Sequence, residues 1–106
     1  MKVFKFGGAS IKDAPSIKNI LEIISKYEKD NLVIVVSAMG KTTNALEKVV
    51  DSYFNDKTQL QSSISDVFNF HINILNNLFE KNHFIFSELN TSFEKLGSFI
   101  KSNKSP

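Results

Sequence analysis

The sequence predicts an α/β fold that opens with a strand, a helix and a second, parallel strand. Residues 3–6 and 32–36 are short apolar runs rich in the β-branched and aromatic residues that strands favour. Between them, apolar residues at positions 17, 20, 21, 24 and 27 share one helical face. Two strands joined by a helix in this order form a right-handed β-α-β unit.

The first helix and the second strand have their own sequence signals. Ser10 or Asp13 can cap the helix, and Pro15 fits its first turn, where no amide hydrogen bond is lost. The helix should end near residues 29–31. Residues 32–36 are apolar without a break, which predicts a buried parallel strand.

The rest of the chain is predicted to be helical. Asn44 followed by Glu47 predicts a capping box at the start of a second helix, which residues 55–57 interrupt. A longer helix then reaches a turn at residues 82–83, and a last helix precedes an irregular polar tail at residues 101–106. The apolar positions that repeat at helical spacing are Leu46, Val49, Val50, Tyr53 and Phe54, then Leu60, Ile64, Val67, Phe68, Ile72, Leu75, Leu78 and Phe79, and finally Leu89, Phe93, Leu96 and Ile100.

Composition excludes several classes of function. The 106 residues suffice for one small domain, and 13 basic against 11 acidic residues leave a net charge of only +2. No basic run suggests nucleic acid or an anionic membrane as a partner. There is no Cys, and His71 and His83 have no partners at ligand spacing, so we expect no metal site. Without an apolar span or a signal peptide, the expected compartment is the cytoplasm.

The two predicted strands end in segments suited to an anion. Residues 7–10 follow the first strand and residues 37–44 follow the second, and both contain small and hydroxyl side chains. Ligands of parallel sheets bind beyond the carboxyl ends of the strands. Backbone amides, a helix N-terminus and a lysine in one place favour a phosphate group there.

Lys5 and the Gly7-Gly8 pair have two interpretations each. Lys5 lies on the opposite strand face from Phe4 and Phe6, where it could offset charge on a transferring phosphoryl group. Alternatively, it is an edge lysine that discourages aggregation. The glycine pair lets a ligand approach the backbone closely, but such pairs also mark ordinary turns.

The segment at residues 40–42 is not a P-loop. Its letters match the end of the pattern G-x-x-x-x-G-K-[ST], but the first glycine of that pattern would fall at Val35, inside a predicted strand. Thr42, Thr43 and Asn44 are also ordinary helix-capping residues. Capping is compatible with ligand binding at the same place.

Two motifs carry a resemblance to a known family. The letters VFKFGGAS at residues 3–10 resemble the K-F-G-G-[TA]-S signature that opens aspartate kinases, and VVSAMGKTTN at residues 35–44 is similar to their second motif, V-V-S-A-…-T-N. The resemblance extends over about residues 1–50. It implies an amino acid kinase fold, a three-layer α/β/α sandwich of the carbamate kinase-like type. The chain would be its helix-rich, truncated N-terminal portion.

Domain organisation follows from that resemblance. Residues 1–106 would form a partial amino acid kinase domain, with a β-α-β core at about residues 1–50 and a helical excursion at about 51–103. Only two strands are identifiable, fewer than a doubly wound sheet contains, so we expect the front of a longer protein.

The resemblance also implies a reaction and a set of site residues. Aspartate kinases transfer the γ-phosphate of ATP, used with Mg²⁺, to the side-chain carboxylate of L-aspartate, the first step towards lysine, threonine and methionine. Lys5 would be the catalytic residue that neutralises phosphoryl charge. The ATP and phosphate site would comprise Lys5, Phe6, Gly7, Gly8 and Ser10. The aspartate site would comprise Ser37, Ala38 and Thr43.

The sequence departs from the family pattern in two places. Ala9 stands where Thr is common, and no S-x-G-E motif is present, since Ser98 and not Glu follows Gly97. We therefore expect the 106 residues alone to be inactive. We also expect a natural homo-oligomer, and non-native association of the fragment through its cut sheet edge.

Two alternatives remain open from the sequence. The chain could belong to another phosphotransferase of the amino acid kinase fold that acts on a different acceptor. It could also be a helical binding module whose glycines and threonines only form turns and caps.

Overall fold

The computed structural model describes residues 1–102. Contacts between Cα atoms divide the chain into two compact units, Met1–Glu47 and Lys48–Pro106, which we describe separately. The last four residues of the predicted polar tail lie outside the described residues, whereas Lys101 and Ser102 are helical. The elements in chain order are β1 (Lys2–Phe6), a 3-10 helix η1 (Gly8–Ile11), α1 (Ala14–Ser25), β2 (Leu32–Val36), α2 (Thr42–Asn55), a 3-10 helix η2 (Lys57–Gln59), α3 (Leu60–Leu78) and α4 (Phe84–Ser102).

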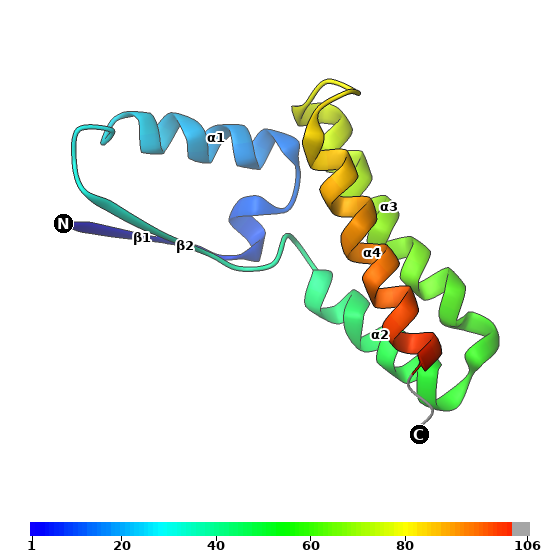
Figure 1. Cartoon of the computed structure of the whole chain (residues 1–106). Coiled ribbons are helices and arrows are strands. Elements are labelled where there is room, and N and C mark those ends of the chain that lie inside the picture. The colour runs from blue at the N-terminus through cyan, green and yellow to red at the C-terminus, as the bar shows by residue number, and fades with distance from the viewer. Residues whose placement is uncertain (103–106) are drawn as a thin grey trace. The chain divides into compact units, whose positions relative to one another are not determined.

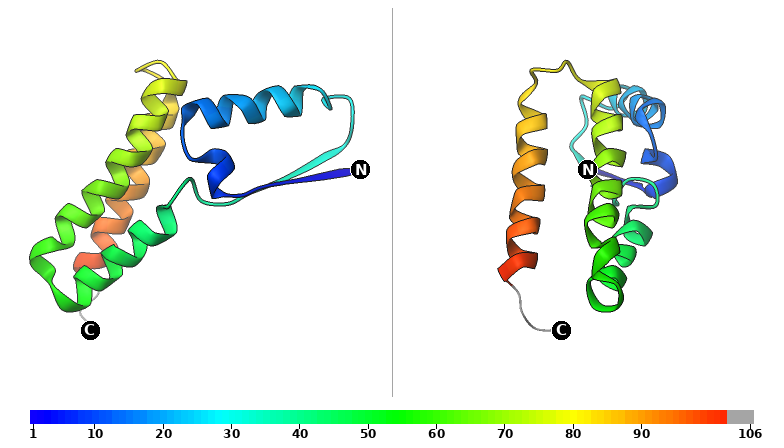
Figure 2. Two further views of the ribbon diagram at one scale, coloured as in Figure 1. Left: turned by 180° about the vertical axis from the view of Figure 1, so that it is seen from behind. Right: turned by 90° about the vertical axis from the view of Figure 1, so that its right-hand side faces the viewer.

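The first unit contains the predicted pair of parallel strands. β1 pairs with β2 in parallel register from Lys2 opposite Leu32 to Phe6 opposite Val36. α1 connects them and runs along one side of the strands, as Figures 1 and 2 show. The strand–helix–strand order of the sequence prediction is thus confirmed.

The N-terminus of α1 is capped as the sequence predicts, by the second of the two candidates. The side chain of Asp13 accepts a hydrogen bond from the amide of Ser16 at 2.9 Å, which satisfies one of the free amides of the first turn. Pro15 lies in that first turn. Ser10, the other candidate, belongs to η1.

The C-terminus of α1 comes earlier than predicted, at Ser25 instead of residues 29–31. The amides of Lys26 and Tyr27 donate to carbonyls only three residues back, at 3.3 and 2.9 Å, so the last turn tightens and ends the helix. Tyr27 leaves the helical stripe and packs on Phe4, with ring centroids 5.1 Å apart.

The prediction that β2 is buried is wrong. Val33, Ile34, Val35 and Val36 are 41%, 42%, 45% and 59% exposed. Burial of a parallel strand requires neighbours on both edges and helices on both faces. Within residues 1–102, β2 has β1 on one edge only. Leu21, on the predicted apolar stripe of α1, is 60% exposed, so that stripe is only partly covered.

The second unit is helical, as predicted. α3 and α4 lie side by side and contact each other through Phe68 and Phe93, whose ring centroids are 5.1 Å apart (Figures 1 and 2). His71 forms a 2.8 Å hydrogen bond with the carbonyl of Val67 and is half-buried. It is therefore packed, which the absence of ligand spacing around it predicts. Across the part of the chain described, none of the helices is long and apolar enough for a membrane span.

The start of α2 differs from the predicted capping box. The helix begins at Thr42, so Asn44 lies inside its first turn and does not cap it. The amide of Ala45 already donates to the carbonyl of Lys41 at 3.1 Å, which starts the helical ladder before Asn44. The chain interruption at residues 55–57 is present, and Asp56 there accepts a hydrogen bond from the amide of Thr58 at 3.1 Å.

Candidate active site

The candidate site lies where β1 and β2 end, and it is made by two loops. The first loop is residues 7–10 and the second is residues 37–41. The amide of Ser37 donates to the carbonyl of Phe6 at 3.1 Å, which carries the strand pairing one step beyond the sheet. The loops therefore leave the sheet side by side, as parallel register requires of two strands that end together.

Direct contact joins the two loops at their glycines. The amide of Gly40 donates to the carbonyl of Gly8 at 3.2 Å. A Cβ placed on Gly8 would lie 2.7 Å from the carbonyl oxygen of Gly40 and 3.3 Å from that of Ala38, too close for any side chain. Gly7 is different, because a Cβ there would meet nothing within 4 Å. Close packing between loops thus requires glycine at position 8 and not at position 7.

The second loop turns into α2 through Gly40 and Thr42. Gly40 has a φ of 56°, in the left-handed region that glycine adopts without strain. The hydroxyl of Thr42 donates to the carbonyl of Met39, and the amide of Thr42 donates to the same oxygen at 3.1 Å. Thr42 is only 7% exposed. Both bonds close a turn on Met39 and do not cap the free amides of α2, so they differ from the helix capping that the sequence suggested for Thr42. The burial of Thr42 and the Gly8–Gly40 contact were not predicted either.

The sequence-predicted phosphate residues fall on two faces of β1. Lys5 is exposed, while its neighbours Phe4 and Phe6 are half-buried, as alternation along a strand requires. Phe6 and Ser10 line a shallow hollow of about 310 Å³ against α1, together with Ala9, Lys12, Ser16, Asn19, Ile20 and Ile23. The side chains of Phe6 and Ser10 are therefore not on the Lys5 face, and only the backbone of Phe6 takes part in the loop junction.

The predicted aspartate-site residues are accessible. Ser37 is exposed, and its hydroxyl donates to the carbonyl of Ala38 at 3.0 Å. Thr43 is exposed in the first turn of α2. Ala38 packs beside Gly8 through its carbonyl oxygen. Parts of both predicted sites thus meet at the glycine contact.

The electrostatics of this edge favour an anion. The N-terminus of α2 carries the positive end of a fourteen-residue helix, and its first turn contains no acidic residue. Lys41 is exposed immediately before that turn, and Lys5 is exposed on β1. Free amides at a helix start together with cationic side chains suit a phosphate group.

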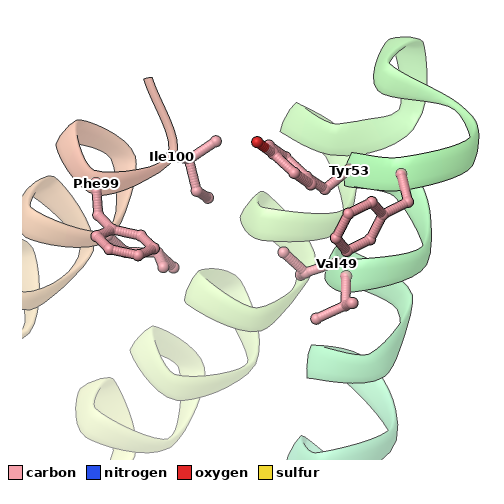
Figure 3. Close-up of a pocket in the computed structure, with 7 residues that line it drawn as sticks. Val49, Tyr53, Phe99 and Ile100 are labelled. Carbon is pink, nitrogen blue, oxygen red and sulfur yellow. The ribbon is translucent and has the colours of Figure 1, made fainter. Parts of the chain in front are cut away.

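Two other hollows lie in the second unit, and one of them, of about 300 Å³, contains the polar side chains of Gln61, Asn90 and Glu94 but no lysine or glycine-rich loop suited to a phosphate. An open groove of about 220 Å³ in the second unit is lined almost wholly by carbon, from Val49, Val50, Tyr53, Phe54, Leu96, Phe99 and Ile100 (Figure 3). Residues 1–102 contain no group of three or more His, Cys, Asp or Glu side chains arranged to hold a metal ion. The junction of the two loops is therefore the strongest candidate for chemistry.

Comparisons with known proteins agree with the two motifs. The profile described as the Amino acid kinase family matches residues 1–93. "Aspartokinase 1, chloroplastic" of Arabidopsis thaliana is 35% identical over 80 residues, covering 72% of this chain and 14% of the relative. "Aspartokinase 2, chloroplastic" of the same plant is 48% identical over 46 residues, covering 43% and 8%. The "Bifunctional aspartokinase/homoserine dehydrogenase" of Buchnera aphidicola is 30% identical over 78 residues, covering 73% and 9%.

These matches confirm the resemblance to aspartokinases and also delimit it. The chain spans 14% or less of the length of each of these three relatives. The family profile, in contrast, covers most of the chain and includes β1, β2, both loops and the start of α4. The α/β fold class predicted from the sequence is consistent with that assignment. The chain belongs to the amino acid kinase family.

Proposed function

We propose that the protein carrying this chain is an aspartate kinase, which transfers the γ-phosphate of ATP to the side-chain carboxylate of L-aspartate. The observation that carries the proposal is the junction of the two motif loops, where the amide of Gly40 meets the carbonyl of Gly8. The similarity to three aspartokinases supports the choice of substrate. The product, aspartyl phosphate, would feed lysine, threonine and methionine synthesis.

In the proposed reaction a carboxylate oxygen of aspartate attacks the γ-phosphorus of ATP. One P–O bond forms, the bond to the β-phosphate oxygen breaks, and ADP leaves with that electron pair. No proton needs to be removed from the carboxylate, so no general base is required. Catalysis then depends on positioning and on stabilising negative charge.

Each predicted residue has a role suited to its place. The exposed ammonium of Lys5 would neutralise charge on the transferring group, and the backbone at Gly7 and Gly8 would present amides to it. Ser37, Ala38 and Thr43 would line the aspartate site. Phe6 and Ser10 would belong to the ATP and phosphate site as parts of the first loop, since their side chains line the hollow against α1. Removing one such charge-stabilising group typically lowers the rate by about 10²- to 10³-fold.

Mg²⁺ would enter with ATP and neutralise charge on its phosphates. The described residues fit the phosphates better than the metal. The loops at residues 7–10 and 37–41 carry no acidic side chain, and glycine-rich loops next to a helix N-terminus favour phosphates. Residues 1–102 hold no acidic cluster for a metal ion. These residues would therefore contact the phosphates, and we assign no metal ligand among them.

A hydroxamate assay tests the proposal. Acyl phosphates react with hydroxylamine, so aspartyl phosphate formed from MgATP and L-aspartate gives aspartyl hydroxamate. We expect activity in the longest natural form of the protein and none in the 106-residue chain alone. ADP formation with another carboxylate or phosphate acceptor, but not with aspartate, would replace the substrate assignment and keep the phosphotransferase class. No phosphoryl transfer to any acceptor would favour the helical binding module.

We also propose that the protein is cytoplasmic. We further propose that the chain associates with a second copy of itself. The exposed apolar residues of β2 at positions 33–36 lie beside an edge that is unpaired within residues 1–102. Such edges pair readily with a second chain. Val33→Lys should therefore reduce the average mass measured by sedimentation equilibrium, whereas Lys2→Arg, which keeps the charge on β1, should not. A wild-type chain that stays monomeric at all concentrations would contradict association.

A further inference from the structure

We propose that Gly40 and Thr42 are positioning residues that lock the second loop against Gly8, so that the phosphate site and the aspartate site share one geometry. The inference rests on the proposed kinase function. Neither residue is assigned a contact with substrate. They would act through the loop residues that flank them.

Three backbone anchors hold the second loop. The amide of Ser37 is held by the carbonyl of Phe6 at 3.1 Å, and the amide of Gly40 by the carbonyl of Gly8 at 3.2 Å. The carbonyl of Met39 accepts two hydrogen bonds from Thr42. Among residues 37–40, these contacts hold the backbone of Ser37, Met39 and Gly40, and Ala38 lies between held neighbours. The predicted aspartate-site residues Ser37 and Ala38 therefore sit on a segment with little freedom.

The same contact orients the first loop. A peptide unit is planar and trans, so its carbonyl and its amide point in opposite directions. When Gly40 holds the carbonyl of Gly8, it also fixes the direction of the amide of Ala9. A change in the second loop would therefore turn an amide of the first loop.

Gly40 and Gly8 make this contact possible in different ways. Gly40 needs its left-handed φ of 56° so that the chain can turn into α2 directly after the amide that bonds to Gly8, and a β-branched residue resists that φ. Gly8 needs to lack a side chain, because a Cβ would lie 2.7 Å from the carbonyl oxygen of Gly40. Thr42 contributes the hydroxyl, and its burial keeps water from competing for the Met39 carbonyl.

Removing the Thr42 hydroxyl should lower kcat by a larger factor than it changes the folding equilibrium. Loss of one hydroxyl hydrogen bond changes a folding equilibrium by about tenfold or less. A displacement of about 1 Å at reacting groups can lower a rate by about 100-fold. A positioning residue should therefore lower kcat more than it lowers stability.

The test uses the longest natural form of the protein and two substitutions of similar size. Thr42→Val removes the hydroxyl and keeps the shape, whereas Thr42→Ser keeps the hydroxyl. We expect Thr42→Val to lower kcat by about 10- to 100-fold and to raise KM for both ATP and aspartate. Thr42→Ser should stay within about threefold of wild type, well below the loss expected from misplacement. Wild-type kcat and KM in Thr42→Val would overturn the proposal.

A second pair of variants tests Gly40. Asn tolerates left-handed φ values and Val does not, so Gly40→Asn should retain more activity than Gly40→Val. Equal activity in these two variants would contradict a requirement for the left-handed turn. Gly97→Ala, in α4, is the activity control, since its Cβ would meet nothing within 4 Å.

Amide hydrogen exchange tests the contact between the two loops independently of the proposed kinase function. The amide of Gly40 should exchange slowly in the wild-type protein without substrate, and at least about tenfold faster in Thr42→Val if the lock opens. This result would support the lock even if the wild-type protein made no aspartyl phosphate, in which case only the proposed function would fail. Equally fast exchange at Gly40 in both proteins would overturn the lock whatever the activity.

Discussion

The side-chain hydroxyls of Ser52 in α2 and Ser63 in α3 lie 2.9 Å apart and share a hydrogen bond. Ser52 is only 7% exposed, so water has little access to its oxygen. Ser63 is half-buried and keeps access to solvent. The bond therefore joins α2 to α3 through one buried polar group.

Removing Ser63 should destabilise the chain more than removing both hydroxyls. Ser63→Ala leaves a buried hydroxyl at Ser52 unsatisfied, which costs about 1–3 kcal/mol. The double variant Ser52→Ala/Ser63→Ala removes both polar groups, so its free energy of unfolding should lie closer to wild type. Urea unfolding of the single and double variants measures this difference. A double variant less stable than Ser63→Ala would contradict the buried-pair explanation.

Asp13 should make the stability of α1 depend on pH. The hydrogen bonds from Ser16 hold the pKa of the Asp13 carboxyl below its ordinary value. A folded-state pKa that is lowered stabilises the fold above the ordinary pKa, and this stabilisation is lost as pH falls through the lowered value. The loss should therefore develop below about pH 4.

Unfolding experiments at a series of pH values check the role of Asp13. Asp13→Asn retains an acceptor for the cap but cannot titrate, so the stability of this variant should fall less steeply between about pH 5 and pH 2. Asp13→Ala should be less stable than Asp13→Asn at neutral pH, because it has no cap. The same pH slope in wild type and Asp13→Asn would show that this carboxyl does not contribute.

Gly97 and Gly8 should respond oppositely to alanine. Gly97 lies inside α4 in open space, so Gly97→Ala should raise the free energy of unfolding by about 0.5–1 kcal/mol through reduced chain entropy. Gly8→Ala forces a Cβ to within 2.7 Å of a backbone oxygen and should cost about 1–3 kcal/mol. Urea midpoints of the two variants compare these effects. Destabilisation by Gly97→Ala would indicate that an unseen neighbour fills that space.

The elements of the fold were predictable where local chemistry determines them. Asp13 and Pro15 mark the start of α1. The apolar periodicity predicted over residues 60–79 and 89–100 falls on α3 and α4, except that Phe79 is extended just after α3 and α4 begins five residues earlier, at Phe84. The end of α1 was not predictable in this way, because Tyr27 leaves the helix to pack on Phe4, which is distant in sequence. Tertiary contacts override local periodicity at such places.

Burial and the loop junction were harder to predict. The apolar run of β2 resembles a buried strand, yet burial depends on how many neighbours the strand has, and here β1 is the only strand that pairs with it in residues 1–102. Likewise, the residue types at positions 8, 40 and 42 predict turns there. Which atoms of the two loops meet depends on the exact register of β1 and β2, with Phe6 opposite Val36. The site motifs and their meeting at one edge of the sheet were therefore predictable from the sequence, whereas the hydrogen bond between Gly40 and Gly8 was not.

The proposed kinase function depends most on Lys5, which we expect to stabilise charge on a transferring phosphoryl group. The most direct measurement is the steady-state rate of aspartyl hydroxamate formation by the longest natural form of the protein, with Lys5→Met and Lys2→Met compared. Lys2 lies on the same strand, with its ammonium 5.5 Å from the centroid of the Tyr27 ring and so away from the two loops. Lys2→Met is therefore a matched control that removes one positive charge from β1 outside the candidate site. We predict that Lys5→Met lowers kcat by about 100-fold or more, while Lys2→Met stays near wild type. Equal activity in Lys5→Met and the wild-type protein would contradict the claim and leave Lys5 as an exposed strand residue without a catalytic role.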